Sequence, residues 1–453
     1  MPRQPFRTVL FAILCLLAGP LRAATAPAPA LPEGVAPLPP ESAGHFQELL
    51  EAAEKYRGLE ARRPIPAGTL AEPELRRKMS ESVGEELSPG QLKAIEAGAK
   101  AFGLIPESMD LSRYLPELLT TQVAGFYDPE RRYLALIRRD GAGPAKDAEA
   151  GRDPEDAIIV HELTHALQDQ HFDLRKFEET DPMSDGATAR SALAEGDATL
   201  TMTSFMAGAS VETVPGMGEA MSAFLNDPNG MAGAASDLPG GDELAKAPAW
   251  IRDSLLFSYV QGFSFCLDVR RAGGQKLLDY AFTTDPPRSS EQILHPEKWR
   301  GRRDDPIVLA WPDLSSILPG WAKVSEGEAG EATITTLLRE SSRDRRTAQA
   351  AAAGWGGDRF AVYEKAGRRL LVWWTEWDGE SDAREFEKAA RRLGAGWRVE
   401  ALSGRRVQVV RGDSALPREQ RKALRARLTA AEAAPPANQA IDLKAVNQGP
   451  KGQ

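Results

Sequence analysis

Residues 161–165 read His161-Glu162-Leu163-Thr164-His165, and this H-E-x-x-H pattern constrains the chain more than any other segment. In an α-helix, residues four positions apart lie on one face, about 6 Å from each other along the axis. Two imidazoles so placed can bind one zinc ion, and the carboxylate between them can act as a general base on a zinc-bound water. The pattern therefore predicts a helix that carries a metal site.

The residues around the motif support a helix. Asp153 is a capping residue, and Pro154 suits the first helical position. Apolar residues occupy most positions from Ile158 to Leu167, which is typical of a largely buried helix. The two histidines lie in a polar stripe on that helix. Buried polar groups need partners, and a metal ion is the simplest partner for a pair of imidazoles.

Two residues compete to be the third ligand that zinc requires. His171 follows His161 by ten residues, which is the spacing of metzincin-type sites, but those sites have a glycine where this chain has Gln168. On a continuous helix, His171 would point about 80° to 120° away from the two motif histidines. The other candidate is Glu195, because residues 192–199 are rich in small side chains and predict a second helix that packs closely on the first.

Three blocks of the sequence carry a resemblance. They are residues 161–172 (HELTHALQDQHF), 195–198 (EGDA) and 289–296 (SSEQILHP). With them the chain resembles the gluzincin group of zinc metallopeptidases, in a bacterial envelope branch, over about residues 110–300. The resemblance implies zinc-dependent hydrolysis of peptide bonds in a peptide or protein substrate by an exported bacterial protein. The alternative is a non-catalytic zinc-binding protein that serves envelope assembly or interaction.

The resemblance also implies roles for particular residues. His161, His165 and Glu195 would bind one Zn²⁺ ion, and Glu162 would be the general base. Because the ligands comprise two neutral imidazoles and one carboxylate, the loaded site would carry a formal charge of about +1, which suits a developing oxyanion.

Two further roles stay open. Gluzincins often stabilise the tetrahedral intermediate with a distant histidine or tyrosine, and the candidates here are His295 and Tyr259. Thermolysin-like enzymes have an aspartate four residues after the ligand glutamate, where this chain has Thr199. Support for a ligand histidine must then come from elsewhere, and Asp197 and Asp169 are the candidates.

We expect an α+β fold. It would comprise a zincin-like catalytic domain with mostly helical surroundings at residues 44–310 and a separate C-terminal α+β module at residues 325–433. Strand-like segments at 122–127 and 132–137 flank a turn, and this hairpin predicts a sheet edge beside the zinc helix, where an extended peptide can add as a strand. Residues 207–248, rich in glycine and proline, predict a flexible insertion.

Alternating apolar patterns predict the elements of the C-terminal module. Helices are expected at 331–353 and 382–393, and strands at 360–363, 370–374, 397–402 and 407–410. The segment Gly354-Trp355-Gly356-Gly357-Asp358 predicts a tight loop.

The start of the chain has the pattern of an export signal. Residues 1–26 predict a signal peptide, with Arg3 and Arg7 before an apolar run at 9–17 and a small-residue cleavage site at 24–26. The run is too short to span a bilayer comfortably. We therefore expect a periplasmic or secreted protein with no membrane span after signal cleavage.

Charge and cysteine content limit the partners. The formal charge of −9 and the lack of a basic stripe argue against nucleic acid. Only Cys266 remains after signal cleavage, so no internal disulfide is expected. Residues 27–43 predict a proline-rich linker and 434–453 a disordered tail, and the helical part that follows the linker is either scaffold or an inhibitory segment over the cleft. The sequence does not indicate an oligomeric state.

Overall fold

The structure is a computed structural model of the 453-residue chain. It describes residues 31–86, 88–138, 153–178, 180–216, 219–220, 223, 241–342, 344–412, 414, 416–436, 438, 440–443 and 446. The predicted signal peptide and the middle of the predicted insertion lie outside the described residues. Among the helices that the structure describes, none is long and apolar enough to cross a membrane.

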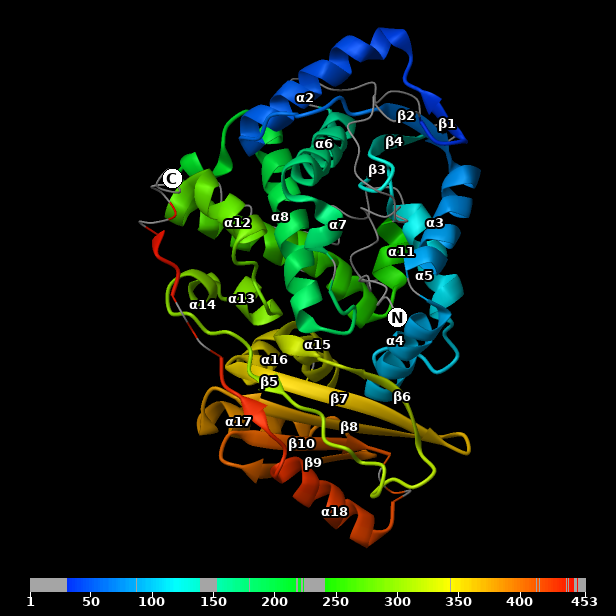
Figure 1. Cartoon of the computed structure of the whole chain (residues 1–453), viewed down its shortest axis with the longest axis vertical. Helices are drawn as coiled ribbons and strands as arrows, with labels where there is room; N and C mark the ends of the chain where they lie inside the picture. The colour runs from blue at the N-terminus through cyan, green and yellow to red at the C-terminus, as the bar shows by residue number, and fades with distance from the viewer. Residues whose placement is uncertain are drawn as a thin grey trace, which may run out of the picture.

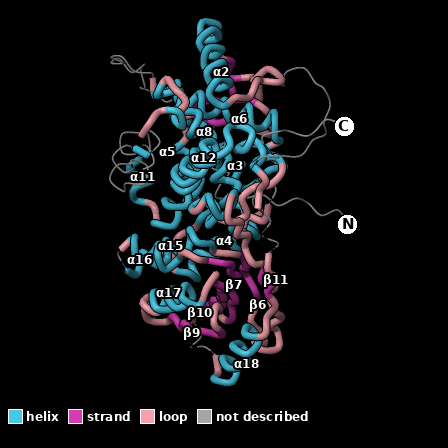
Figure 2. Tube along the Cα trace, turned by 90° about the vertical axis from the view of Figure 1, so that its left-hand side faces the viewer, coloured by secondary structure: helices cyan, strands magenta, loops and turns pink. Residues whose placement is uncertain are grey.

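The chain has a helical part with a small mixed sheet and, below it in Figure 1, a module built on a five-stranded sheet. Figure 2 shows most strands gathered in that module. This arrangement confirms the predicted α+β class and the separate C-terminal α+β module. The elements of the helical part are β1 (Val35–Pro37), α2 (Ala43–Arg57), β2 (Ala67–Ala71), α3 (Glu72–Glu86), α4 (Pro89–Phe102), α5 (Leu111–Gln122), β3 (Gly125–Asp128), β4 (Tyr133–Arg138), α6 (Pro154–Phe172), α7 (Leu174–Phe177), α8 (Asp185–Ala207), α11 (Gly241–Lys246), α12 (Ala249–Thr283), α13 (Ser290–Leu294) and α14 (Pro296–Arg300).

The small sheet has the order β1-β2-β4-β3, with β2 parallel to β4 and the other neighbours antiparallel. The expected hairpin is confirmed as β3 and β4. Its turn forms because one carboxylate oxygen of Asp128 accepts hydrogen bonds from the backbone N–H groups of Glu130, at 2.9 Å, and Arg131, at 2.8 Å. Strand β3 lies at the edge of this sheet, and Figure 1 shows it next to α6.

Helix α6 begins as the sequence predicts. Asp153 caps it by accepting a hydrogen bond from the Glu155 backbone, and Pro154 is the first helical residue. The helix continues through Gln168 to Phe172, so the chain does not turn back where metzincin-type sites require it.

Helices α8 and α12 cross at two glycines. A Cβ atom at Gly262 would lie 2.0 Å from the Ala192 carbonyl oxygen, and one at Gly196 would lie 2.1 Å from the Gly262 carbonyl carbon. Both distances are far inside van der Waals contact, so only glycine permits this approach. The crossing explains why the segment around Glu195 consists of small residues.

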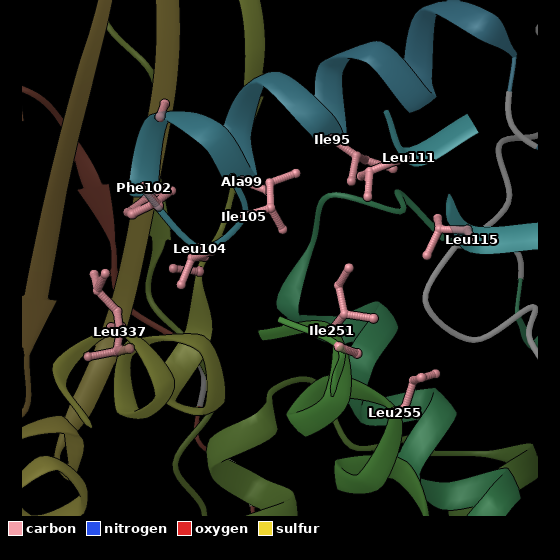
Figure 3. Packing of buried hydrophobic residues seen from close by; sticks show 14 of the residues in the cluster. Ile95, Ala99, Phe102, Leu104, Ile105, Leu111, Leu115, Ile251, Leu255 and Leu337 are labelled. Carbon is pink, nitrogen blue, oxygen red and sulfur yellow. The ribbon is translucent and has the colours of Figure 1, made fainter. Parts of the chain in front are cut away.

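One hydrophobic cluster joins the two parts of the molecule. Its side chains include residues of α4, α5, α12 and the first helix of the C-terminal module, α15 (Gly330–Ser342), together with residues of both sheets. Figure 3 shows Ile95 and Ala99 of α4 together with Ile251 and Leu255 of α12, while Leu337 of α15 lies beneath Leu104. Because these side chains share one buried cluster, the module packs against the helical part.

The C-terminal module has an antiparallel sheet of order β6-β7-β8-β10-β9. Its elements, with the flanking β5 and β11 ribbon, are β5 (Val308–Leu309), β6 (Ala322–Gly327), α15, α16 (Arg345–Ala352), β7 (Trp355–Lys365), β8 (Arg368–Trp377), α17 (Glu380–Ala390), β9 (Trp397–Ser403), β10 (Arg406–Arg411), α18 (Arg418–Thr429) and β11 (Ala433–Ala434).

The loop predicted at residues 354–358 is wrong, since β7 already begins at Trp355. Only Gly354 has the positive φ, 75°, of a turn residue. The carboxylate of Asp358 holds the start of the strand, because it accepts hydrogen bonds from the indole N–H groups of Trp355 and Trp373 and from two backbone N–H groups at residues 329 and 330.

Part of the segment expected to be a disordered tail makes contacts. The side chain of Asn438 accepts a hydrogen bond from the Asp305 backbone at 2.8 Å. Ile441 is buried, and Leu443 and Val446 pack with it against the cluster formed around α8 and α12. These apolar residues follow the module and return the chain to the helical part.

We expect Gly262→Ala to destabilise the protein by about 1 to 3 kcal/mol, because the added methyl group must push α8 and α12 apart. Urea denaturation with fluorescence detection measures this change. The matched control is Gly44→Ala in α2, where an added Cβ meets nothing within 4 Å. It should stabilise the protein by about 0.5 to 1 kcal/mol through helix propensity. Equal effects of the two substitutions would contradict the close crossing.

Candidate metal site

Three buried ligand atoms from α6 and α8 converge on one point. The Nε2 atoms of His161 and His165 are 3.0 Å apart. The Oε2 atom of Glu195 lies 3.0 Å from the first and 3.5 Å from the second. The side chains are 6%, 0% and 3% exposed. The structure thus brings together the two motif histidines and the glutamate that the resemblance implies.

The spacing of these atoms fits a metal ion. A tetrahedral zinc ion with bonds of about 2.0 to 2.1 Å keeps its ligand atoms about 3.3 Å apart, and the three observed separations lie around that value. A single hydrogen atom can bridge only one pair of these three atoms well, whereas a cation between them interacts with all three. Two imidazoles and one carboxylate are also the ligand types that zinc takes in hydrolytic sites. The cluster is therefore able to hold a metal ion.

The electrostatics of the cluster favour a positive charge within it. Burial lowers the pKa of His161. Burial acts the same way on His165, but the Glu195 carboxylate outweighs it and raises the pKa of His165 to about 9. Although burial opposes ionisation of Glu195, the two imidazoles hold the pKa of that carboxyl well below its usual range. Glu195 is thus a buried carboxylate that stays ionised, and its charge needs a protonated imidazole or a metal cation beside it.

Glu162 lies beside the ligands, and a hydrogen bond from strand β3 of the small sheet fixes its side chain. Its Oε2 accepts a hydrogen bond from the backbone N–H of Tyr127, in β3, at 2.9 Å. The side chain is buried, and burial together with the Glu195 charge raises the pKa of Glu162 to about 8, against the opposing effect of His165. A carboxyl with such a raised pKa in a site of this kind is suited to accept and return a proton.

Tyr259 joins the cluster, since its ring stacks on that of His161 with centroids 5.9 Å apart and an angle of 28° between the planes. His295 lies elsewhere, at the end of α13, where its Nε2 is 3.1 Å from the carboxylate of Glu331 in α15. That carboxylate raises the pKa of His295. Of the two candidate oxyanion donors, the structure therefore places Tyr259, and not His295, beside the ligands.

His171 has a partner of its own. Its Nε2 is 2.7 Å from the carbonyl oxygen of Glu60, and its ring is tilted by 59° against that of Phe172. This placement follows from the continuous helix, on which His171 points away from the motif histidines. Of the two candidates for third ligand, the structure places Glu195 with the pair.

The two aspartates that the sequence offered as supports for a ligand histidine, Asp169 and Asp197, have other hydrogen-bond partners. Asp169 accepts hydrogen bonds from the Tyr127 hydroxyl and from Arg63, both at 2.9 Å. Asp197 accepts from Gln168 and from Arg57. Thr199 is buried, and its hydroxyl has no hydrogen-bond partner within the described part of the chain.

Sequence reasoning assigned no role to Gln168 and did not single out Arg57. Gln168 carried a signal, because a buried amide seven residues after His161 stands on the same polar stripe of the helix. Arg57 carried none, since it lies more than a hundred residues before the motif and no local pattern connects it with the histidines.

A second group of acids, Glu291, Asp304 and Asp378, has ligand atoms within 4.8 Å of one another. The ammonium of Lys298 already bridges the three carboxylates, at 2.6, 2.9 and 2.7 Å respectively. This group is therefore an ion-pair network that ties α13 and α14 to the C-terminal module.

Comparison with known proteins gives one match. Residues 318–440 match a family described as a domain of unknown function (DUF8575), and the match covers most of the C-terminal module and less than half of the chain. No curated protein and no solved structure matches the chain. The metal cluster lies outside the matched residues.

We expect the full chain to bind one divalent metal ion, and Glu195→Ala to lose most of it, because two imidazoles alone leave the site incomplete. Elemental analysis after dialysis measures metal per chain. His171→Ala is the matched control and should retain the ion, since His171 bonds to Glu60 instead. Retention by Glu195→Ala with loss by His171→Ala would contradict this ligand set.

Proposed function

We propose that this protein is a zinc-dependent peptidase that hydrolyses peptide bonds. The observation that carries the proposal is the buried triangle of His161, His165 and Glu195 with the Glu162 carboxyl beside it. Zinc held there would supply Lewis acidity, which polarises a substrate carbonyl and lowers the pKa of a water molecule to about 7.

The protein's own groups provide the acid–base chemistry. The Tyr127 N–H fixes one oxygen of Glu162, so we assign proton transfer to the other oxygen, Oε1. Glu162 takes the proton of the attacking water there and delivers it to the leaving amine. Tyr259 is the candidate for a hydrogen bond to the developing oxyanion, because it lies against His161. His295 is less suited, since Glu331 is its partner.

The sheet edge supports a peptide as substrate. Strand β3 is the edge of the four-stranded sheet and packs beside α6. An extended chain can add to such an edge through main-chain hydrogen bonds. One edge group, the Tyr127 N–H, is already used by Glu162, and all four residues of β3 are buried, so a substrate could pair with β3 only after the segments that cover it move aside. An exported, periplasmic or secreted location is part of the proposal and rests on the sequence at residues 1–26.

A zinc-binding protein without turnover is the second candidate, and the substitution Glu162→Gln separates the two. In an enzyme, it should leave zinc bound while peptide hydrolysis falls by about 100- to 10,000-fold, because the proton acceptor is lost. Digestion of a peptide library, followed by mass spectrometry and compared with a chelator-treated sample, measures the activity.

The matched control is Glu155→Gln, which makes the same change at an exposed position in the first turn of α6. It should cleave peptides like the unchanged protein. If the unchanged protein binds zinc but cleaves no peptide in the library, the enzymatic proposal is wrong. If Glu162→Gln cleaves at the same rate as the unchanged protein, the role of Glu162 as general base is wrong.

A further inference from the structure

The orientation of the Gln168 side chain is fixed by two acceptors. Its Nε2 donates to the carbonyl oxygen of Ala194 at 3.0 Å and to the carboxylate of Asp197 at 2.8 Å. An amide nitrogen has two hydrogens, and both are used. The amide oxygen therefore faces the other way, where it lies 2.9 Å from Nδ1 of His165.

This orientation determines which nitrogen of His165 can bind a metal. An amide oxygen only accepts, so Nδ1 of His165 must carry the hydrogen in that contact. A neutral imidazole with hydrogen on Nδ1 has its lone pair on Nε2. Nε2 is the atom that faces His161 and Glu195. Gln168 thus selects the tautomer in which His165 is a ligand.

Asp197 is in turn held by a buried arginine. The Arg57 Nε donates to the same carboxylate oxygen of Asp197 at 2.5 Å, and its Nη1 donates to Asp279 at 2.9 Å. The side chains of Arg57 and Asp197 are 0% exposed. Although burial opposes its charge, the two carboxylates raise the pKa of Arg57, so it remains a cation. A charge-assisted pair of this kind is geometrically rigid.

The geometry points to Gln168, Asp197 and Arg57 as positioning residues of the metal site, which act on the metal through His165. Their hydrogen bonds run from α2 through α8 to α6 and end on a ligand ring. Arg57 is the last residue of α2, so this helix takes part in the proposed network. Its buried contact with Asp197 favours the scaffold alternative for α2 over an inhibitory segment. The inference rests on the proposed function for the identity of the ion.

A neighbouring pair provides a comparison within the same structure. Arg63 donates to Asp169 at 2.9 Å, so it too is an arginine from the N-terminal part paired with an aspartate, here on α6 itself. Asp169 also accepts a hydrogen bond from the Tyr127 hydroxyl. Within the part of the chain that the structure describes, neither Arg63 nor Asp169 hydrogen-bonds to the ring of His161 or His165, or to Gln168. This pair should stabilise the fold without affecting the ligands.

The test is the zinc affinity of Gln168→Met, which preserves size and helix propensity but removes both the acceptor for His165 and the donors to Asp197. Competition with a chromogenic chelator should show zinc bound about 10- to 100-fold more weakly than by the unchanged protein. The visible absorption of the Co²⁺-loaded protein should also change, because the ligand ring is no longer fixed. The control Arg63→Gln should bind zinc with unchanged affinity and give an unchanged Co²⁺ spectrum.

A more conservative substitution tests the hydrogen bonds at the α2 end of this network. Arg57→Lys keeps the charge but loses the fork that reaches both Asp197 and Asp279. Zinc affinity should fall in the same direction as for Gln168→Met. Circular dichroism and thermal melting of the metal-free proteins show whether each variant is folded.

The outcomes separate this inference from the proposed function. Zinc affinity of folded Gln168→Met within twofold of the unchanged protein would overturn the positioning role, even where Glu162→Gln still abolishes hydrolysis. Unchanged affinity in Arg57→Lys would overturn the part assigned to α2. Absence of zinc binding by the unchanged protein would instead defeat the proposed function itself, and with it the reason to assign the chain of hydrogen bonds to a metal.

Discussion

The arrangement of the helical part depends on a buried carboxylate, Glu195, held between two imidazoles. An ionised carboxylate in a protein interior is costly unless opposite charge and hydrogen bonds surround it. His161 and His165 supply part of this compensation, and a metal cation held between the three groups would supply the rest. Because the two histidines lie one turn apart on α6, Glu195 must approach that helix from the side, and α8 has to pack directly against it.

The close crossing of α8 and α12 serves both the core and the site. Gly196, next to Glu195, and Gly262 let the two backbones meet without side chains between them. Tyr259 lies three residues before Gly262, nearly one turn along α12, so the same crossing brings its ring onto His161. Without these glycines, α12 would stand further away and the tyrosine would lose its place beside the ligand. The substitution that loosens the core would therefore also open the site.

Local signals in the sequence predicted a large part of this. The cap at Asp153, the proline after it and the H-E-x-x-H spacing act within one helix, and α6 forms as they indicate. Glu195 was one of two candidates for the third ligand, and the resemblance was needed to favour it, because no local pattern says which distant residue faces the histidines. Arg57 was missed, since its role depends on a partner 140 residues away. The strand at Trp355 was read as a loop because its glycines suggested one, whereas Asp358 and two indoles hold it extended.

The C-terminal module bears on the site through the helix that carries the third ligand. Asp185, at the start of α8, accepts hydrogen bonds from the backbone and the hydroxyl of Ser290, and its own N–H donates to Glu328 of the module. Helix α8 is thus fixed at its start by the module and in its middle by α12 and by Arg57. Rigid elements position ligand atoms more accurately than loops do. The module matched as DUF8575 therefore supports the candidate metal site by holding α8 in place, although it supplies none of the three candidate ligand atoms.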